Sequence, residues 1–238
     1  MSVLAYMGYY YYDVTYLLVI LGAVLSMIAS AQVNSTFKRY SRVRSGCGMT
    51  GAEAAERILY RNGLTNVRIE HISGNLTDHY DPSSKVLRLS DATYNATSVA
   101  AVGVAAHECG HAVQDAKGYA PLKFRSALVP AANFGSKFGL PIFVLGLFLG
   151  SNDLLMQIGI WVFLAAVLFQ IVTLPVEFDA SHRAMGFLTE YGILSENEAE
   201  GSYRVLRAAA MTYVAAAAAA LLNLLRLVML SRRDDRRD

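Results

Sequence analysis

The sequence has little charge, few cysteines and none of the common nucleotide-binding patterns. Only 17% of its 238 residues are charged, and the formal net charge is +2. Its two cysteines, Cys47 and Cys109, do not indicate a disulfide framework, which is compatible with a reducing compartment. No phosphate-binding glycine loop and no internal repeat are present. Together these absences argue against a disulfide-rich secreted domain and against a nucleic-acid partner.

Apolar residues dominate instead. They make up 54% of the chain, and the mean hydropathy is +0.33, which predicts an integral membrane protein. Four apolar stretches are long enough to cross a bilayer as helices, at about residues 14–33, 128–149, 154–176 and 211–230. The first is interpreted as an uncleaved anchor, with Tyr9–Tyr12 forming an interfacial belt at its start. The second and third are predicted to form a hairpin, because only a short polar turn at 150–153 separates them.

Basic residues after the first apolar stretch predict how the chain is oriented in the membrane. Lys38, Arg39, Arg42 and Arg44 follow it closely, and the positive-inside rule places them in the cytoplasm. The last stretch fits less well, because a full crossing would put the arginine-containing tail outside. An interfacial or re-entrant helix and a reversed orientation are the alternatives. The alanine run at 215–220 is predicted to be a helix-packing face.

The region between the first two apolar stretches reads as a small mixed domain. A capping box at residues 50–53 opens a helix that ends near Asn62. Strands are predicted at 67–72 and 85–90, separated by a turn at 81–83. The second strand is interpreted either as an edge that pairs with an extended peptide or as the partner of the first strand.

A five-residue motif within a predicted helix at 98–114 carries the chemistry. His107 and His111 are four residues apart, so both imidazoles face one side of the helix and can bind one zinc ion. Glu108 stands beside this pair and is predicted to act as the general base toward a water whose pKa zinc lowers to about 7. Cys109, between the two histidines, is predicted to point away from the metal.

A catalytic zinc site usually has three protein ligands, so one more is needed. The metzincin pattern is excluded, because Gln114 and Lys117 occupy the positions of its glycine and third histidine. The next group of ligand-type residues follows the third apolar stretch and contains Glu177, Asp179 and His182. A hairpin of two crossings returns the chain to the face that it left, so these residues are predicted to approach the zinc helix.

Several segments resemble one known family. The sequences at 76–82, 86–90, 107–114 and 177–181 are similar to the YugP-like neutral zinc metallopeptidases of bacterial membranes, and more distantly to HtpX-type and CAAX-prenyl proteases. This resemblance implies a gluzincin with Glu177 as the third zinc ligand. The more distant relatives carry an aspartate four residues after that glutamate, where this chain has Ser181. Asp179 and Asp115 are the candidates to replace that carboxylate.

The sequence and the resemblance together predict a membrane-embedded zinc metalloendopeptidase. Its cofactor is predicted to be Zn²⁺, bound by His107, His111 and Glu177, and its general base is predicted to be Glu108. His182 is predicted to donate a hydrogen bond to the oxyanion, and a role on a polar helix face is the alternative. The expected partners are the lipid bilayer and a peptide or membrane-protein substrate, as in membrane protein quality control. A second copy of the chain or another membrane protein is a further candidate partner. The competing hypothesis is a catalytically inactive, zinc-stabilised scaffold or partner subunit.

The expected fold class is a mainly α integral membrane protein with about four transmembrane helices and a small α+β zincin-like cytoplasmic domain. The protein is expected to be multi-pass in the cell membrane, with its active site on the cytoplasmic side. The predicted organisation is an N-terminal transmembrane anchor at 1–33, a cytoplasmic zincin-like domain at 34–126, a transmembrane hairpin at 127–176, a cytoplasmic helix with the third ligand at 177–208, and a C-terminal membrane helix with a charged tail at 209–238.

Overall fold

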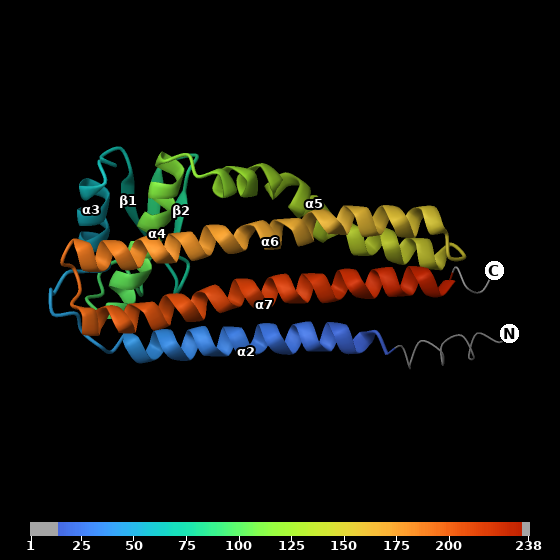
Figure 1. Ribbon diagram of the computed structural model, residues 1–238, viewed down its shortest axis with the longest axis horizontal. Coiled ribbons are helices and arrows are strands. Elements are labelled where there is room, and N and C mark those ends of the chain that lie inside the picture. The colour runs from blue at the N-terminus through green and yellow to red at the C-terminus, as the bar shows by residue number, and fades with distance from the viewer. Residues whose placement is uncertain (1–13, 235–238) are drawn as a thin grey trace. The chain divides into compact units, whose positions relative to one another are not determined.

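The computed structural model describes residues 14–234. The predicted tyrosine belt at Tyr9–Tyr12 and the last residues of the charged tail lie outside the described residues. The elements are, in chain order, α2 (Tyr16–Tyr40), α3 (Gly51–Arg61), β1 (Arg68–Ile72), β2 (His79–Asp81), β3 (Val86–Ser90), α4 (Val99–Ala116), α5 (Ala120–Phe148), α6 (Asp153–Glu190) and α7 (Glu196–Asp234) (Figure 1).

These elements form two compact units. The helical unit consists of the described residues of Met1–Ile28, Leu128–Ile171 and Val214–Asp238, and the sheet unit consists of Ala29–Ala127 and Val172–Tyr213. Helices α2, α5, α6 and α7 each contribute residues to both units. The three strands, α3 and α4 belong wholly to the sheet unit.

Close packing of α5 on α6 holds the helical unit together. A Cβ atom at Gly135 would lie 2.5 Å from the carbonyl oxygen of Val162, so the two backbones meet where no side chain fits between them. The predicted polar turn joins the two helices, and Gly150 takes a φ of +76° there. The α5–α6 hairpin expected from the sequence is therefore confirmed.

The alanine run packs in the same way. A Cβ atom at Gly22 of α2 would lie 3.1 Å from the Cβ atom of Ala219 in α7, and Ala215 and Ala217 are buried. Small residues let two helices approach closely without a large apolar driving force. The predicted helix-packing role of the run is confirmed.

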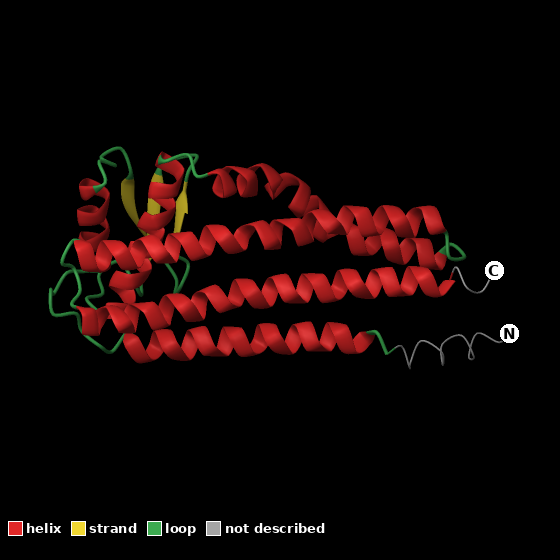
Figure 2. Ribbon diagram, in the orientation of Figure 1, coloured by secondary structure: helices red, strands yellow, loops and turns green. Residues whose placement is uncertain are grey.

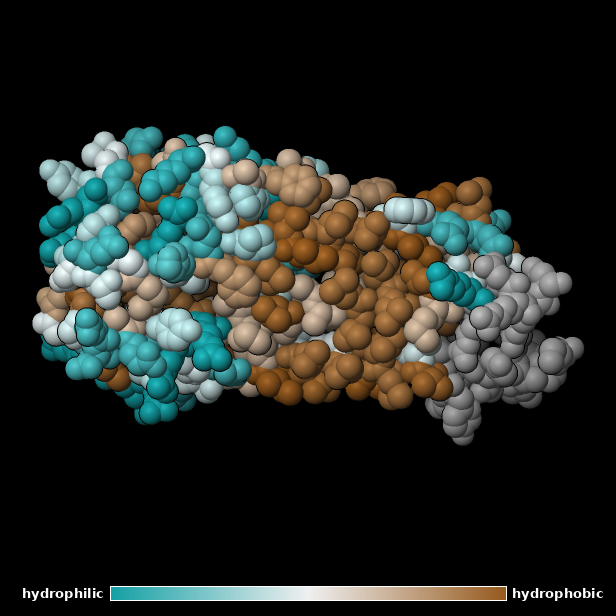
Figure 3. All heavy atoms as spheres, viewed as in Figure 1, coloured by the Kyte–Doolittle hydropathy of each residue, from teal (hydrophilic) through white to brown (hydrophobic). Residues whose placement is uncertain are grey.

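The outer surface of the helical unit is apolar. Figure 3 shows mostly hydrophobic side chains over it, and large residues such as Leu17, Phe148 and Trp161 are more than half exposed. Four helices of the described chain, α2, α5, α6 and α7, are long and apolar enough to cross a membrane. They extend beyond the predicted apolar stretches, because the backbone hydrogen bonds of a helix continue into polar sequence. Helix α6, for example, ends at Glu190 rather than near residue 176.

The sheet unit contains a three-stranded sheet in the order β1-β3-β2. Strand β3 is parallel to β1 and antiparallel to β2. The strands are drawn in yellow in Figure 2. The interpretation of residues 85–90 as an edge strand for substrate is therefore wrong, because β3 lies in the centre and pairs on both sides. Its nearly continuous burial from Val86 to Ser90 is typical of a strand that is covered on both faces. The alternative, pairing with the first strand, is confirmed.

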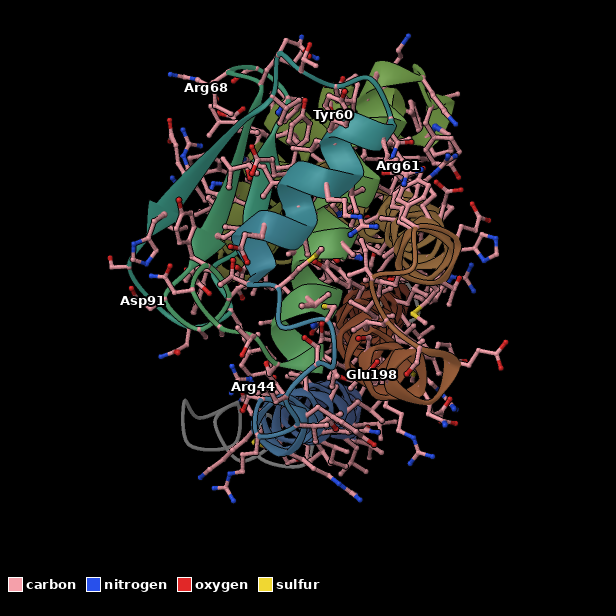
Figure 4. The ribbon with its side chains drawn as sticks, turned by 90° about the vertical axis from the view of Figure 1, so that its left-hand side faces the viewer. Arg44, Tyr60, Arg61, Arg68, Asp91 and Glu198 are labelled. Carbon is pink, nitrogen blue, oxygen red and sulfur yellow. The ribbon has the colours of Figure 1, made fainter. Side chains whose placement is uncertain are left out.

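Helix α3 packs against α4 and contacts β1. Its predicted capping box is present, because the Thr50 amide donates to Glu53 Oε2 at 2.8 Å and the Glu53 amide donates to Thr50 Oγ1 at 3.2 Å. Figure 4 shows α3 beside the strands, with Tyr60 and Arg61 on its last turn and Arg68 at the start of β1. The core beneath contains Ile58, Leu87 and Val102.

Candidate metal centre

Helix α4 carries the two histidines of the motif. It begins after Ser98, whose side chain accepts a hydrogen bond from the Ala101 amide at 3.2 Å, as an N-cap residue does. His107 and His111 follow on one face, and their ring centroids lie 4.8 Å apart in an edge-to-face arrangement. The predicted shared face of the two imidazoles is therefore present.

Glu177 of α6 meets these imidazoles. Its Oε2 atom lies 3.3 Å from His107 Nε2 and 3.6 Å from His111 Nε2. The three side chains are the group of potential metal ligands found among the described residues, and their donor atoms all lie within 4.8 Å of one another. The Glu177 side chain is only 4% exposed. A residue 66 positions after His111 in the sequence thus closes the site that the motif begins.

Gln114 sets the proton position of His111. Its Nε2 atom donates to the carbonyl oxygen of Val176 at 2.8 Å and to Asp179 Oδ2 at 2.7 Å, so its Oε1 atom must face His111 Nδ1, 3.0 Å away. Because Oε1 can only accept, Nδ1 of the imidazole carries the hydrogen. The lone pair of His111 is then on Nε2, the atom that faces Glu177, as a metal ligand requires.

Ser181 takes the corresponding place at His107. Its Oγ atom lies 3.2 Å from His107 Nδ1. Of the two carboxylates considered as replacements, Asp179 acts through Gln114 on the other histidine. Asp115 instead accepts hydrogen bonds from Tyr80 Oη and Lys85 Nζ. Neither carboxylate therefore lies at Nδ1 of His107, where the hydroxyl group of Ser181 is found instead.

Gly110 explains how α6 comes so near to α4. A Cβ atom at this position would lie 2.6 Å from the carbonyl oxygen of Ala180 and 3.1 Å from its Cα atom. Real Cβ atoms essentially never lie that close to another heavy atom. The absence of a side chain at Gly110 therefore allows the backbone of α6 to approach, and Glu177 lies one helical turn before Ala180.

Glu108 is buried beside the metal-ligand candidates. It is 7% exposed, and its charge interacts with those of His107, His111 and Glu177. Burial raises the pKa of the Glu108 carboxyl above its ordinary value, and the two histidines oppose this effect. Cys109, the next residue, points to the other side, where its Sγ atom lies 3.6 Å from the carbonyl oxygen of Ala55 in α3. Both orientations agree with the sequence prediction.

Two further residues at the site were not predicted. Arg125 of α5 donates from Nη1 to Glu177 Oε1 at 2.9 Å. Tyr213 of α7 interacts with Glu177, Glu108 and Arg125. Neither residue has a local sequence signal, because each reaches the site from a distant position. Gln114, in contrast, lies three residues after His111, and this helical spacing could have identified it.

His182 is not part of this group. It is exposed, and it lies five residues after Glu177, which turns it about 140° away around α6. Its predicted role as an oxyanion donor stays a prediction. His71 and His79 also lie elsewhere, where they contact Asp91 Oδ1 and the carbonyl oxygen of Thr77.

The three residues fit zinc. Zinc binds imidazole nitrogen and carboxylate oxygen at about 2.0–2.2 Å, so two ligands of a tetrahedral ion lie about 3.4 Å apart. The distances of 3.3 Å and 3.6 Å from Glu177 Oε2 to the imidazoles match this spacing. Three protein ligands also leave a fourth position open, as catalytic sites do.

Two imidazoles and one carboxylate that leave a fourth position open are a ligand set that zinc-dependent hydrolases use. The chain belongs to the family described as "Putative neutral zinc metallopeptidase", which matches residues 15–232. It is similar to the "Putative membrane protease YugP" of Bacillus subtilis (strain 168), with 48% identity over 206 residues that cover 87% of this chain and 91% of that protein. No solved structure matches the chain. The family resemblance inferred from the sequence motifs is confirmed, and both matches support a zinc protease.

Proposed function

We propose that this chain is a membrane-embedded zinc endopeptidase of the gluzincin type, with His107, His111 and Glu177 as metal ligands and Glu108 as general base. The observation that carries the proposal is the position of Glu177 Oε2, at zinc-ligand spacing from both imidazoles. The buried Glu108 next to this group supports an enzyme rather than a scaffold, because a structural zinc site has no need of a second carboxylate that does not bind the metal.

The chain's own residues divide the work. Zinc, when bound, supplies an acidified water and polarises the scissile carbonyl group. Glu108 takes the proton from the attacking water and returns it to the leaving amine. Gln114 and Ser181 hold the two imidazoles in orientation through their Nδ1 atoms.

Strand β2 is the best-placed element for substrate binding. It is an edge strand of the sheet, and it contacts α4. An extended peptide that pairs with the free edge of β2 would therefore run beside the helix that carries His107 and Glu108. This arrangement supports a peptide segment, rather than a small molecule, as the substrate class.

The proposal includes a cytoplasmic active site in the cell membrane. Lys38 and Arg39 in the last turn of α2, with Arg42 and Arg44 after it, support this orientation. Membrane proteins or their fragments are the proposed substrates, which corresponds to a role in membrane protein quality control.

The test uses full-length protein purified in detergent, with zinc analysis and digestion of a quenched fluorescent peptide library. Glu108→Gln should keep its zinc and lose cleavage, since the amide cannot accept the proton. Glu177→Ala should lose both zinc and cleavage. Glu200→Gln serves as a matched control, because Glu200 is exposed and pairs with Arg204 on the surface of α7. Cleavage by Glu108→Gln would refute the mechanism, and a zinc-containing wild type that cleaves nothing would favour the scaffold.

A further inference from the structure

Arg125 is a charged residue of the site that none of the catalytic steps above uses. It lies in the second turn of α5, and its side chain is 26% exposed, whereas the Glu177 side chain that it contacts is 4% exposed. Its Nη1 atom donates to Glu177 Oε1 at 2.9 Å, a distance typical of a charge-assisted hydrogen bond. The contact therefore neutralises a buried carboxylate from the side opposite to the imidazoles.

The two oxygens of Glu177 have different partners. Oε2 faces both imidazoles, whereas Oε1 is occupied by the guanidinium group. A carboxylate that is free on both oxygens can bind a metal through one or both of them. We propose that Arg125 is a positioning residue that holds Glu177 as a one-oxygen zinc ligand and so keeps a coordination position open for water. This inference rests on the function proposed above.

The chain connectivity makes Arg125 suitable for this role. Only residues 117–119 separate α4 from α5, and Gly118 turns the chain there with a φ of +65°. The position of Arg125 is therefore tied to the helix that carries the histidines, while Glu177 comes from α6. Gln114 makes the second link between these elements, through Val176 and Asp179. Gln114 thus links α4 to the residues of α6 on either side of Glu177, whereas Arg125 contacts the carboxylate itself.

Removing such an outer partner of a metal ligand typically costs 10–100-fold in metal affinity or activity. Arg125→Met keeps the aliphatic length and removes the charge and the donors. Arg125→Lys keeps the charge but replaces the planar fork with a compact ammonium group. Arg204→Met is the matched control, because Arg204 pairs with Glu200 in an exposed ion pair on α7.

The experiment measures three properties of the full-length protein in detergent. Zinc affinity comes from competition with a chelator, coordination number from the visible spectrum of the cobalt(II)-substituted protein, and fold from thermal unfolding of the metal-free protein. For Arg125→Met we expect zinc affinity to fall roughly 10–100-fold and the cobalt spectrum to change toward a higher coordination number. Arg125→Lys should give intermediate values, and Arg204→Met should match the wild type.

An unchanged zinc affinity and an unchanged cobalt spectrum in Arg125→Met would overturn the inference, even if its unfolding temperature were lower. That result would make Arg125 a stabilising ion pair only. If Arg125→Met does not fold, Arg125→Lys decides in the same way: reduced affinity and an altered spectrum support the inference, and wild-type values overturn it. A wild type that binds no zinc would instead refute the proposed function itself.

Discussion

Replacing Gly110 by alanine tests the close approach of α4 and α6 on which the metal centre depends. The added Cβ atom would lie 2.6 Å from the carbonyl oxygen of Ala180, whereas ordinary contact begins at 3.4 Å. The obstacle is backbone, which cannot rotate away as a side chain can. Helix α6 must therefore move by about 0.8 Å relative to α4, or α4 must deform.

The size of this shift predicts the outcome. Inserting a methyl group into a well-packed interior costs about 1–3 kcal/mol of folding free energy. A zinc site tolerates changes in ligand distance of only about 0.2 Å, so a displacement of Glu177 by several tenths of an ångström should also weaken metal binding. We expect Gly110→Ala to unfold at a lower temperature, to bind zinc more weakly and to lose most of its peptidase activity.

The matched control is Gly186→Ala on α6. Its Cβ atom would meet only Glu190 Oε1, at 3.7 Å, which is ordinary contact. Alanine in a helix interior is favoured over glycine by about 0.5–1 kcal/mol, so this variant should be as stable as the wild type or more so. The unfolding temperature and the zinc affinity, the latter from competition with a chelator, are measured for both variants and for the wild type. Wild-type stability and zinc affinity in Gly110→Ala would refute the proposed packing of the helices.

Three other substitutions separate ligand orientation, helix stability and transition-state binding. Gln114→Leu removes the hydrogen-bond acceptor at His111 Nδ1 and both hydrogen bonds that Gln114 donates to α6. Zinc affinity, measured by competition with a chelator, should therefore fall about 10–100-fold. An unchanged affinity would contradict the orienting role of Gln114. Thr50→Ala removes the α3 capping box and should cost about 1 kcal/mol in an unfolding measurement without altering zinc binding. His182→Ala tests the predicted oxyanion donor: a lower kcat at unchanged zinc content would support that role, and an unchanged kcat would contradict it.

The elements with strong local signals were predictable from the sequence. The capping box at Thr50, the N-cap at Ser98 and the polar turn at Gly150 involve neighbouring residues, and the structure has all three. The apolar helices were also predictable, but their ends were not. Hydropathy reports where a segment stops being apolar, whereas the helix itself continues as long as its backbone hydrogen bonds do. Helix α6 thus extends through Glu177 to Glu190.

The sheet shows what local pattern cannot supply. Strand β2 contains only His79–Asp81, so it has too few residues for an alternating pattern to appear. Without it, the segment at 86–90 could be interpreted as an edge, although its run of apolar residues is typical of a central strand. Strand β2 therefore forms the edge of the sheet that contacts α4.

The metal-ligand candidates were largely predictable, whereas their supporting contacts were not. His107 and His111 follow from helical spacing, and Glu177 follows from family resemblance and the return of the hairpin. Arg125 and Tyr213 carry no such signal, because an arginine or a tyrosine in a helix has many ordinary uses. Their roles appear only when α4, α5, α6 and α7 are placed together. The role of a residue that supports a site is therefore harder to predict from the sequence than the role of a metal ligand, because it depends on neighbours that are distant in the chain.

The motif at residues 107–111 illustrates why the surrounding packing matters for chemistry. His107 and His111 face Glu177, and Glu108 is buried beside them. The two intervening positions serve packing instead: Cys109 contacts α3, and Gly110 admits the backbone of α6. Every position of the motif is therefore constrained, three by the metal centre and two by the neighbouring helices. Because Gly110 sets the distance from α4 to the helix that carries the third ligand candidate, a change at this packing position should weaken metal binding although it alters no ligand.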